Sequence, residues 1–133
     1  MRWQSDNLTP HGPTSQSALF DWLTTEGNYN RFRGGDKNKG HTKAAIAKEI
    51  SDYIWKSGVR SIRAPKDILS KIMRFEESFR QAYDFVNNTG ASLEEDNPKI
   101  VSLTAKLHKI CPEYDLLLPI MVDLPNAHPL LHN

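Results

Sequence analysis

Residues 65–86 read PKDILSKIMRFEESFRQAYDFV, and their apolar residues recur at every third or fourth position. This spacing gathers the apolar residues on one face of an α-helix. Pro65 suits the first turn of that helix, because its missing N–H would have no partner there. The stretch therefore predicts a long helix that starts at Pro65 and buries one stripe of side chains: Ile68, Ile72, Phe75, Phe79, Ala82 and Val86.

Shorter helical patterns lie on both sides of this stretch. A helix is expected over 15–26, capped by Ser15 or Ser17, and a second over 42–55, capped by Thr42. The segment 28–41 between them is expected to be a loop. A fourth helix is expected after Pro98, followed by a short helical turn in PEYDLLLPIM. No segment shows the alternation typical of a strand, so the predicted fold class is all-α.

The chain has 133 residues, a length that fits one domain with a modest core. We expect a flexible N-terminal tail over 1–14, a helical domain over 15–122 and a C-terminal tail over 123–133. No apolar run approaches the length of a membrane helix. The N-terminus lacks the apolar centre of a secretion signal, and the single cysteine permits no internal disulfide. These features favour the cytosol or the nucleus.

Positive charge is concentrated in the middle of the chain. Residues 31–80 carry 13 Lys and Arg against 6 Asp and Glu, whereas the whole chain has a net charge of only +1. Such a segment is typical of a surface that binds a polyanion. It fits equally well a solvated surface whose charge is balanced by acidic neighbours in space.

Residues 34–41, GGDKNKGH, come close to the phosphate-binding loop of nucleotide hydrolases. The lysine that such a loop needs is replaced by His41, and no buried strand leads into the first glycine. The sequence therefore argues against nucleotide hydrolysis, and we expect no enzyme activity. The glycines, the basic residues and the helix start that follows still suit phosphate, and a nucleic-acid backbone is the expected source.

The distribution of charge along two helices opposes helix stability. Stability alone would favour acidic residues in the first turn, but Lys43 opens the second expected helix and Lys66 the third. On the third helix Lys66, Ser70 and Arg74 form one row opposite the apolar stripe, with Lys71 beside it. This arrangement is typical of a helix that reads the major groove of DNA. The alternative is a salt-bridged surface helix, in which Asp67 pairs with Lys71.

Three stretches together carry a resemblance to a known family. They are LFDWLTTEGNYNRFRGGDKNKGHTKAAIAKEI, IRAPKDILSKIMRFEESFRQAYDFVNNTG and KICPEYDLLLPIM. The combination resembles a Myb/SANT-like domain of the fungal and oomycete trihelix type, over about residues 17–122. The resemblance implies a three-helix helix-turn-helix core with a long third helix, one or two additional C-terminal helices, and a role in the nucleus. It also implies that Trp22, Phe75 and Phe79 are core aromatics.

The chain departs from the Myb pattern in places. Trp55 follows the core stripe of the second helix, and the third helix uses phenylalanine where tryptophan is regular. SANT relatives often bind histone tails or other proteins, so a protein-interaction module of a chromatin complex is the alternative function.

The predicted function is a double-stranded DNA-binding domain of a nuclear transcription or chromatin regulator. Chromatin or transcription proteins are further expected partners, and dimerisation through the fourth helix stays open. Scattered histidines and a single cysteine predict neither a metal site nor a cofactor. The predicted DNA-binding residues are Arg31, Arg33, Lys37, Lys39 and Lys43 on phosphates, Arg60 and Arg63 at the turn, and Lys66, Ser70, Lys71 and Arg74 in the groove.

Overall fold

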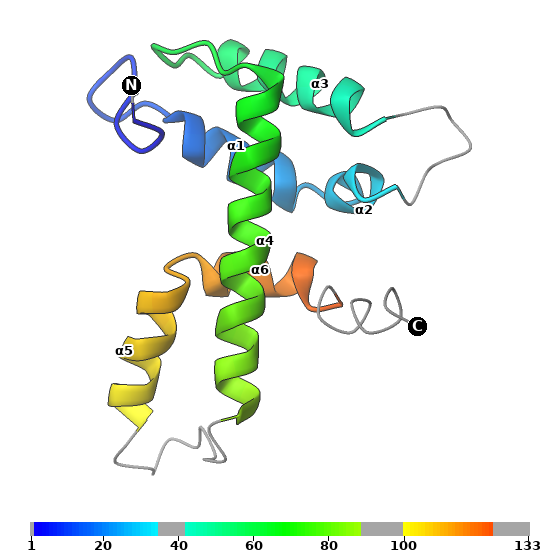
Figure 1. Cartoon of the computed structure of the whole chain (residues 1–133). Helices are drawn as coiled ribbons and strands as arrows, with labels where there is room; N and C mark the ends of the chain where they lie inside the picture. The colour runs from blue at the N-terminus through cyan, green and yellow to red at the C-terminus, as the bar shows by residue number, and fades with distance from the viewer. Residues whose placement is uncertain (1, 35–41, 89–99, 124–133) are drawn as a thin grey trace. The chain divides into compact units, whose positions relative to one another are not determined.

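The computed structural model describes residues 2–34, 42–88 and 100–123, and these residues form α-helices without a β-strand (Figure 1). The described part of the chain therefore has the all-α fold that the sequence predicts. Packing groups the chain into two compact units, Met1–Ile72 and Met73–Asn133, where the sequence predicts one domain over 15–122. Helix α4, Pro65–Asn88, is continuous and contributes residues to both units.

The first unit begins with residues that the sequence assigned to a flexible tail. Instead, residues 2–14 are anchored at Asp6, whose side chain is fully buried. Its carboxylate accepts hydrogen bonds from the Ser15 backbone N–H at 2.7 Å and from Arg63 at 2.8 Å. An isolated bridge between Asn7 and Val59 adds a backbone connection. This anchoring depends on partners far away in the sequence, so composition alone does not reveal it.

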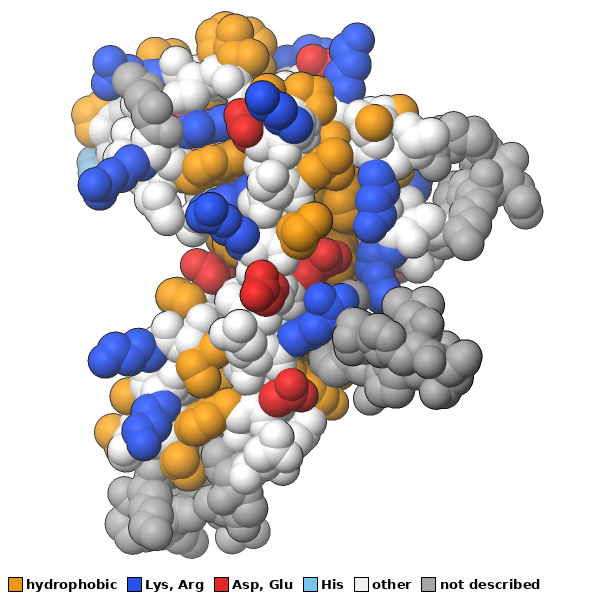
Figure 2. Space-filling view, viewed as in Figure 1, with side chains coloured by type: hydrophobic (Ala, Val, Ile, Leu, Met, Phe, Trp, Pro, Cys, Tyr) orange, Lys and Arg blue, Asp and Glu red, His pale blue; other side chains and the backbone are white. Residues whose placement is uncertain are grey.

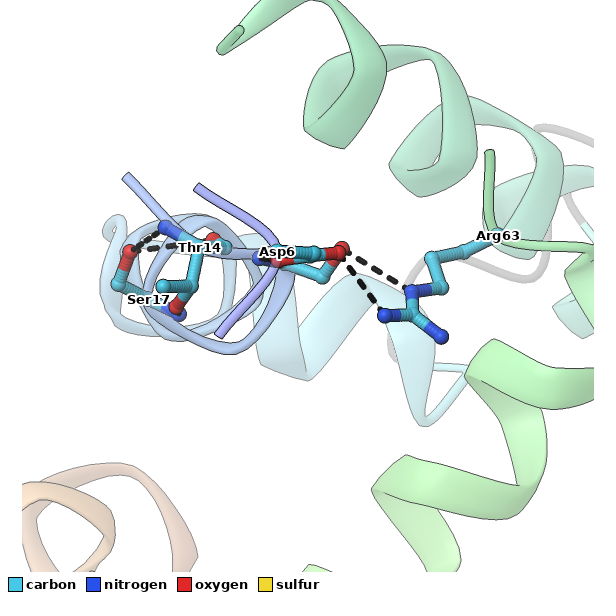
Figure 3. Close-up of polar contacts among 5 residues, drawn as sticks. Asp6, Thr14, Ser17 and Arg63 are labelled. Atoms are coloured by element: carbon cyan, nitrogen blue, oxygen red, sulfur yellow. Dashed lines mark hydrogen bonds and ion pairs between the residues drawn. The ribbon is translucent and has the colours of Figure 1, made fainter. Parts of the chain in front are cut away.

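Helix α1, Ser15–Thr24, begins one residue earlier than a cap at Ser15 would place it and three earlier than a cap at Ser17 would. Thr14 is the N-cap: its hydroxyl accepts the Ser17 N–H, and its own N–H donates to the Ser17 hydroxyl (Figure 3). This reciprocal pair satisfies two amide groups that the first turn leaves without partners. The buried face of α1 includes the predicted core residue Trp22, and α1 packs against α3.

A short helix, α2, Asn28–Phe32, occupies the start of the segment expected to be a loop. Gly27 precedes it with φ of 85°, a left-handed conformation that glycine adopts without strain. Tyr29 and Phe32 lie three positions apart, and both are buried. The burial of these two rings fixes a helix that is too short to be stable alone.

Helix α3, Lys43–Lys56, confirms the second predicted helix. The Thr42 hydroxyl accepts the Ala45 N–H at 3.0 Å, as expected of the N-cap. The core stripe of this helix consists of Ile46, Ile50 and Ile54, which recur every four positions and are buried. Together with α1 and α2 this helix belongs to the first unit.

Helix α4 confirms the long predicted helix and its stripe over most of its length. Its residues 65–72 belong to the first unit and bury Ile68 and Ile72. Its residues 73–88 belong to the second unit and bury Phe75 and Phe79, as the family resemblance implies.

The second unit adds helix α5, Ile100–Ile110, and helix α6, Tyr114–Met121. The rings of Phe79 and Tyr114 stack with centroids 5.3 Å apart. Cys111 is fully buried and lies 3.6 Å from the Ser78 hydroxyl. Burial raises the pKa of the Cys111 thiol, which favours its neutral form. Most of the predicted C-terminal tail, from residue 124 onward, lies outside the described residues.

Candidate nucleic-acid interface

The predicted DNA-binding residues fall on several elements of the fold. Lys37 and Lys39 lie outside the described residues, as do His41 and most of the near-match to a phosphate loop. Arg31 lies on α2, Arg33 follows it, and Lys43 is the first residue of α3. The other predicted residues lie in the connection between α3 and α4 or on α4: Arg60, Arg63, Lys66, Ser70, Lys71 and Arg74.

Three of these residues surround α2, and we call Arg31, Arg33 and Lys43 the α2 cation group. The Arg33 guanidinium lies 5.9 Å from the Tyr29 ring centroid, and the Lys43 ammonium lies 5.2 Å from that of Phe32. Cations at this distance are attracted to the negative face of an aromatic ring. The buried rings of α2 thereby bring residues from two elements into one basic cluster.

Arg31 differs from the other two members because it has an acidic partner. Its Nη1 donates to Glu49 Oε1 at 3.1 Å, and its guanidinium lies 5.7 Å from the Trp22 ring centroid. The Trp22 indole N–H also donates to Glu49, at 3.3 Å. The Glu49 side chain is 46% exposed, so this ion pair is largely screened by solvent. Glu49 nevertheless offsets the charge that Arg31 would offer to a phosphate.

The first half of α4 presents the predicted row to solvent. Lys66, Ser70 and Arg74 are exposed, whereas Ile68 and Ile72 on the opposite face are fully buried. Successive members of the row are four positions apart, so their side chains follow one line along the helix.

Lys71 and Arg63 make a different set of contacts, both with Trp3. The Arg63 guanidinium lies 4.6 Å from the Trp3 ring centroid, and the Lys71 ammonium lies 5.6 Å from it. Arg63 also pairs with Asp6, and its side chain is only 11% exposed (Figure 3). Arg63 is therefore held inside the first unit, and Lys71 is half-buried.

Asp6 is held in its ionised form, which favours the ion pair with Arg63. Burial alone would raise the pKa of this carboxyl group. The hydrogen bonds from Ser15 and Arg63 outweigh that effect and hold the pKa of Asp6 below its ordinary value. Asp6 therefore carries a negative charge at neutral pH and cancels the charge of Arg63.

The α2 cation group lies at one end of α3, and Arg63, which contacts Trp3, lies beyond the other end. Lys43 is the first residue of this helix, and the connection that carries Arg63 follows its last residue. A helix of 14 residues is about 20 Å long. In Figure 2, Lys and Arg side chains lie at several places over α1, α3 and the start of α4, with hydrophobic, uncharged and acidic side chains among them. The basic surface of the first unit therefore consists of separate groups of charge.

Sequence reasoning missed the residues that hold these cations. Trp3, Asp6 and Glu49 contact cations at least 18 positions away, and no local pattern marks such pairs. A signal did exist for α2, because Tyr29 and Phe32 have the spacing of one helical face.

Comparison with known proteins gives no relative: no family model, curated protein or solved structure matches the chain. Within the described ranges, no helix is long and apolar enough to cross a membrane. The same residues hold no group of three or more His, Cys, Asp and Glu side chains placed to bind a metal ion.

Proposed function

We propose that the chain binds double-stranded DNA through the first half of α4 and acts in a nuclear transcription or chromatin regulator. The observation that carries this proposal is the exposed row of Lys66, Ser70 and Arg74 opposite the buried Ile68 and Ile72. A helix with one face in the core and a basic face in solvent fits the major groove of DNA. Lysine and arginine can bind phosphates there or contact the acceptor atoms of guanine.

The α2 cation group supports the proposal from the other end of α3. Arg33 and Lys43 would bind the DNA backbone while α4 occupies the groove. Because the two ends of α3 are about 20 Å apart, a ligand that touches both must span about that distance. Duplex DNA, with a rise of about 3.4 Å per base pair, covers this distance in about six base pairs.

The proposed arrangement uses α1, α3 and α4 as the three helices of a Myb/SANT-like helix-turn-helix core, with α2 as an additional short helix. The resemblance of residues 17–122 to the trihelix type supports this assignment. Among the predicted DNA-binding residues, Arg31 and Arg63 already have acidic partners, so the proposal gives the leading role to Lys66, Ser70 and Arg74.

The proposal is tested by titrating a fluorescently labelled mixed-sequence duplex with the protein at increasing salt. With about four phosphates neutralised, the logarithm of the binding constant should fall against the logarithm of salt with a slope of about −4. A flat salt dependence, or no binding at low salt, would refute DNA binding.

A protein-interaction module of the SANT kind is the second candidate. Exposed apolar side chains favour it, because Trp55 is 50% and Ile62 is 74% exposed on the same unit. Exposed apolar groups often mark a protein contact. Charge reversal at Lys71 and Arg74 separates the two candidates: loss of a protein partner with unchanged duplex binding would favour the protein-interaction module.

A further inference from the structure

The segment 2–7, which we call the N-terminal brace, contacts two basic residues of the proposed DNA surface. Trp3 lies against Arg63 and Lys71, with the distances given above. The Trp3 carbonyl accepts the Gln16 N–H at 3.0 Å, which ties this residue to the start of α1. The Asp6 carbonyl accepts the Arg60 N–H at 2.7 Å, which ties the brace to the connection before α4.

The brace divides the predicted cations into two classes. Arg63 and Lys71, which contact Trp3, are partly or mostly buried. Lys66 and Arg74 lie on the same helix as Lys71 and are exposed. Each pair contains one lysine and one arginine, so residue type does not explain the difference between them, and the two less exposed residues are the ones that contact the Trp3 ring.

We propose that the N-terminal brace is an autoinhibitory contact that withholds Arg63 and Lys71 from the phosphates of DNA. This inference rests on the DNA-binding function proposed above. A lysine attracted to a tryptophan face must leave the ring, or share it, before it can contact a phosphate. Asp6 acts in the same direction, because its buried charge cancels that of Arg63. Displacement of the brace would add positive charge to the surface of α4.

The first test replaces Trp3 in the full chain. Trp3→Ala should bind the labelled duplex about two- to fivefold more tightly, which is the share of affinity that a cation–π contact of ordinary strength withholds. Its salt slope should steepen by about one phosphate contact, because the Trp3 ring no longer holds Lys71. Trp3→Leu should raise duplex affinity by a similar factor, because leucine is apolar but has no negative ring face to attract a cation. Trp55→Ala, at an exposed tryptophan of α3, is the matched control and should leave affinity unchanged.

A second test begins with lysine variants that keep Trp3 and therefore do not depend on the folding of a Trp3 variant. In the chain with an intact brace, Lys66→Ala should weaken duplex binding several-fold, whereas Lys71→Ala should change it less than about twofold. In the Lys71→Ala background, Trp3→Ala should no longer raise affinity by the same factor, because the two residues act through one contact.

The outcomes separate the inference from the function on which it rests. Weaker duplex binding by Trp3→Ala would indicate that Trp3 contacts DNA and would overturn autoinhibition. An equal gain in affinity from Trp3→Ala with and without the Lys71 side chain would also overturn it. If the unmodified chain binds duplex DNA and Trp3→Ala binds no more tightly, the brace inference fails and the proposed function stands. If neither protein binds, both fail.

Discussion

Asp6 joins three segments that are distant in the sequence. Its side chain contacts Ser15 at the start of α1 and Arg63 before α4, and its backbone accepts the Arg60 N–H. A buried carboxylate is tolerated only when hydrogen bonds and an opposite charge replace its water. Here both are present, so one residue fixes how the N-terminal segment meets the start of α4.

Stability should depend on the charge of Asp6. Because the pKa of Asp6 is lower in the folded chain than its ordinary value of 3.8, its contribution is fully present above about pH 4 and is lost as the pH falls further. Asp6→Asn should lower the free energy of unfolding by about 3 kcal/mol at pH 7, since it leaves Arg63 without its charged partner. Urea unfolding between pH 3 and pH 7 checks both effects.

The control for this prediction is Asp21→Asn, at an exposed aspartate of α1. Its effect on unfolding should stay within about 0.5 kcal/mol. Equal stability of Asp6→Asn and the unmodified chain at neutral pH would contradict the role given to Asp6.

Glu49 is the residue that offsets charge in the α2 cation group. Glu49→Gln should cost less than about 1 kcal/mol of stability, because the Arg31–Glu49 pair is exposed. If DNA contacts this group, the same variant should bind a duplex more tightly, since Arg31 becomes available to a phosphate. Asp52→Asn, at another exposed acid of α3, is the control for the change in net charge. Identical gains in duplex affinity in the two variants would show that the change in net charge, and not the release of Arg31, causes the tighter binding.

At the scale of the helices, periodic patterns made α3 and the long α4 predictable. Their buried residues recur over several turns, and the Thr42 cap and Pro65 mark their starts. Helix α2 was missed because five residues give too few repeats of the pattern. The cap of α1 was predicted at Ser15 or Ser17 and is Thr14. The prediction missed it because three hydroxyl residues lie close together, Thr14, Ser15 and Ser17, and each can serve as an N-cap.

Thr42, the N-cap of α3, should contribute to the stability of the first unit. Thr42→Ala should destabilise the first unit by about 1 kcal/mol, because the Ala45 N–H loses its acceptor. Thr42→Ser should retain most of the stability, since serine presents the same hydroxyl. Urea unfolding followed by circular dichroism measures the difference. Equal loss in both variants would contradict a capping role.

At the scale of the whole molecule, the chain carries two compact units that share one helix. The stripe of α4 indicated burial along its length, but a stripe does not say which residues cover it. The candidate site was predictable only in part for a similar reason. Exposure of Lys66, Ser70 and Arg74 follows from the helical wheel, whereas the contacts of Arg63 and Lys71 with Trp3 depend on tertiary packing.

Two core substitutions test the division into units. Ile50→Ala in α3 and Phe79→Ala in α4 should each cost about 3 kcal/mol, because both side chains are fully buried. Hydrogen exchange should accelerate mainly in Met1–Ile72 for the first variant and in Met73–Asn133 for the second. Uniform acceleration across the chain in both variants would indicate a single cooperative unit.

DNA binding through the exposed row of α4 is tested most directly by charge reversal of Lys66 and Arg74 together. The matched control reverses Lys106 and Lys109, two exposed lysines of α5, and changes the net charge by the same amount. In a duplex titration across salt, Lys66→Glu with Arg74→Glu should lower affinity at least about tenfold and reduce the salt slope by about two contacts, whereas the control pair should keep the slope. Equal losses of affinity and slope in the two double variants would contradict the assignment of α4 as the DNA-binding helix.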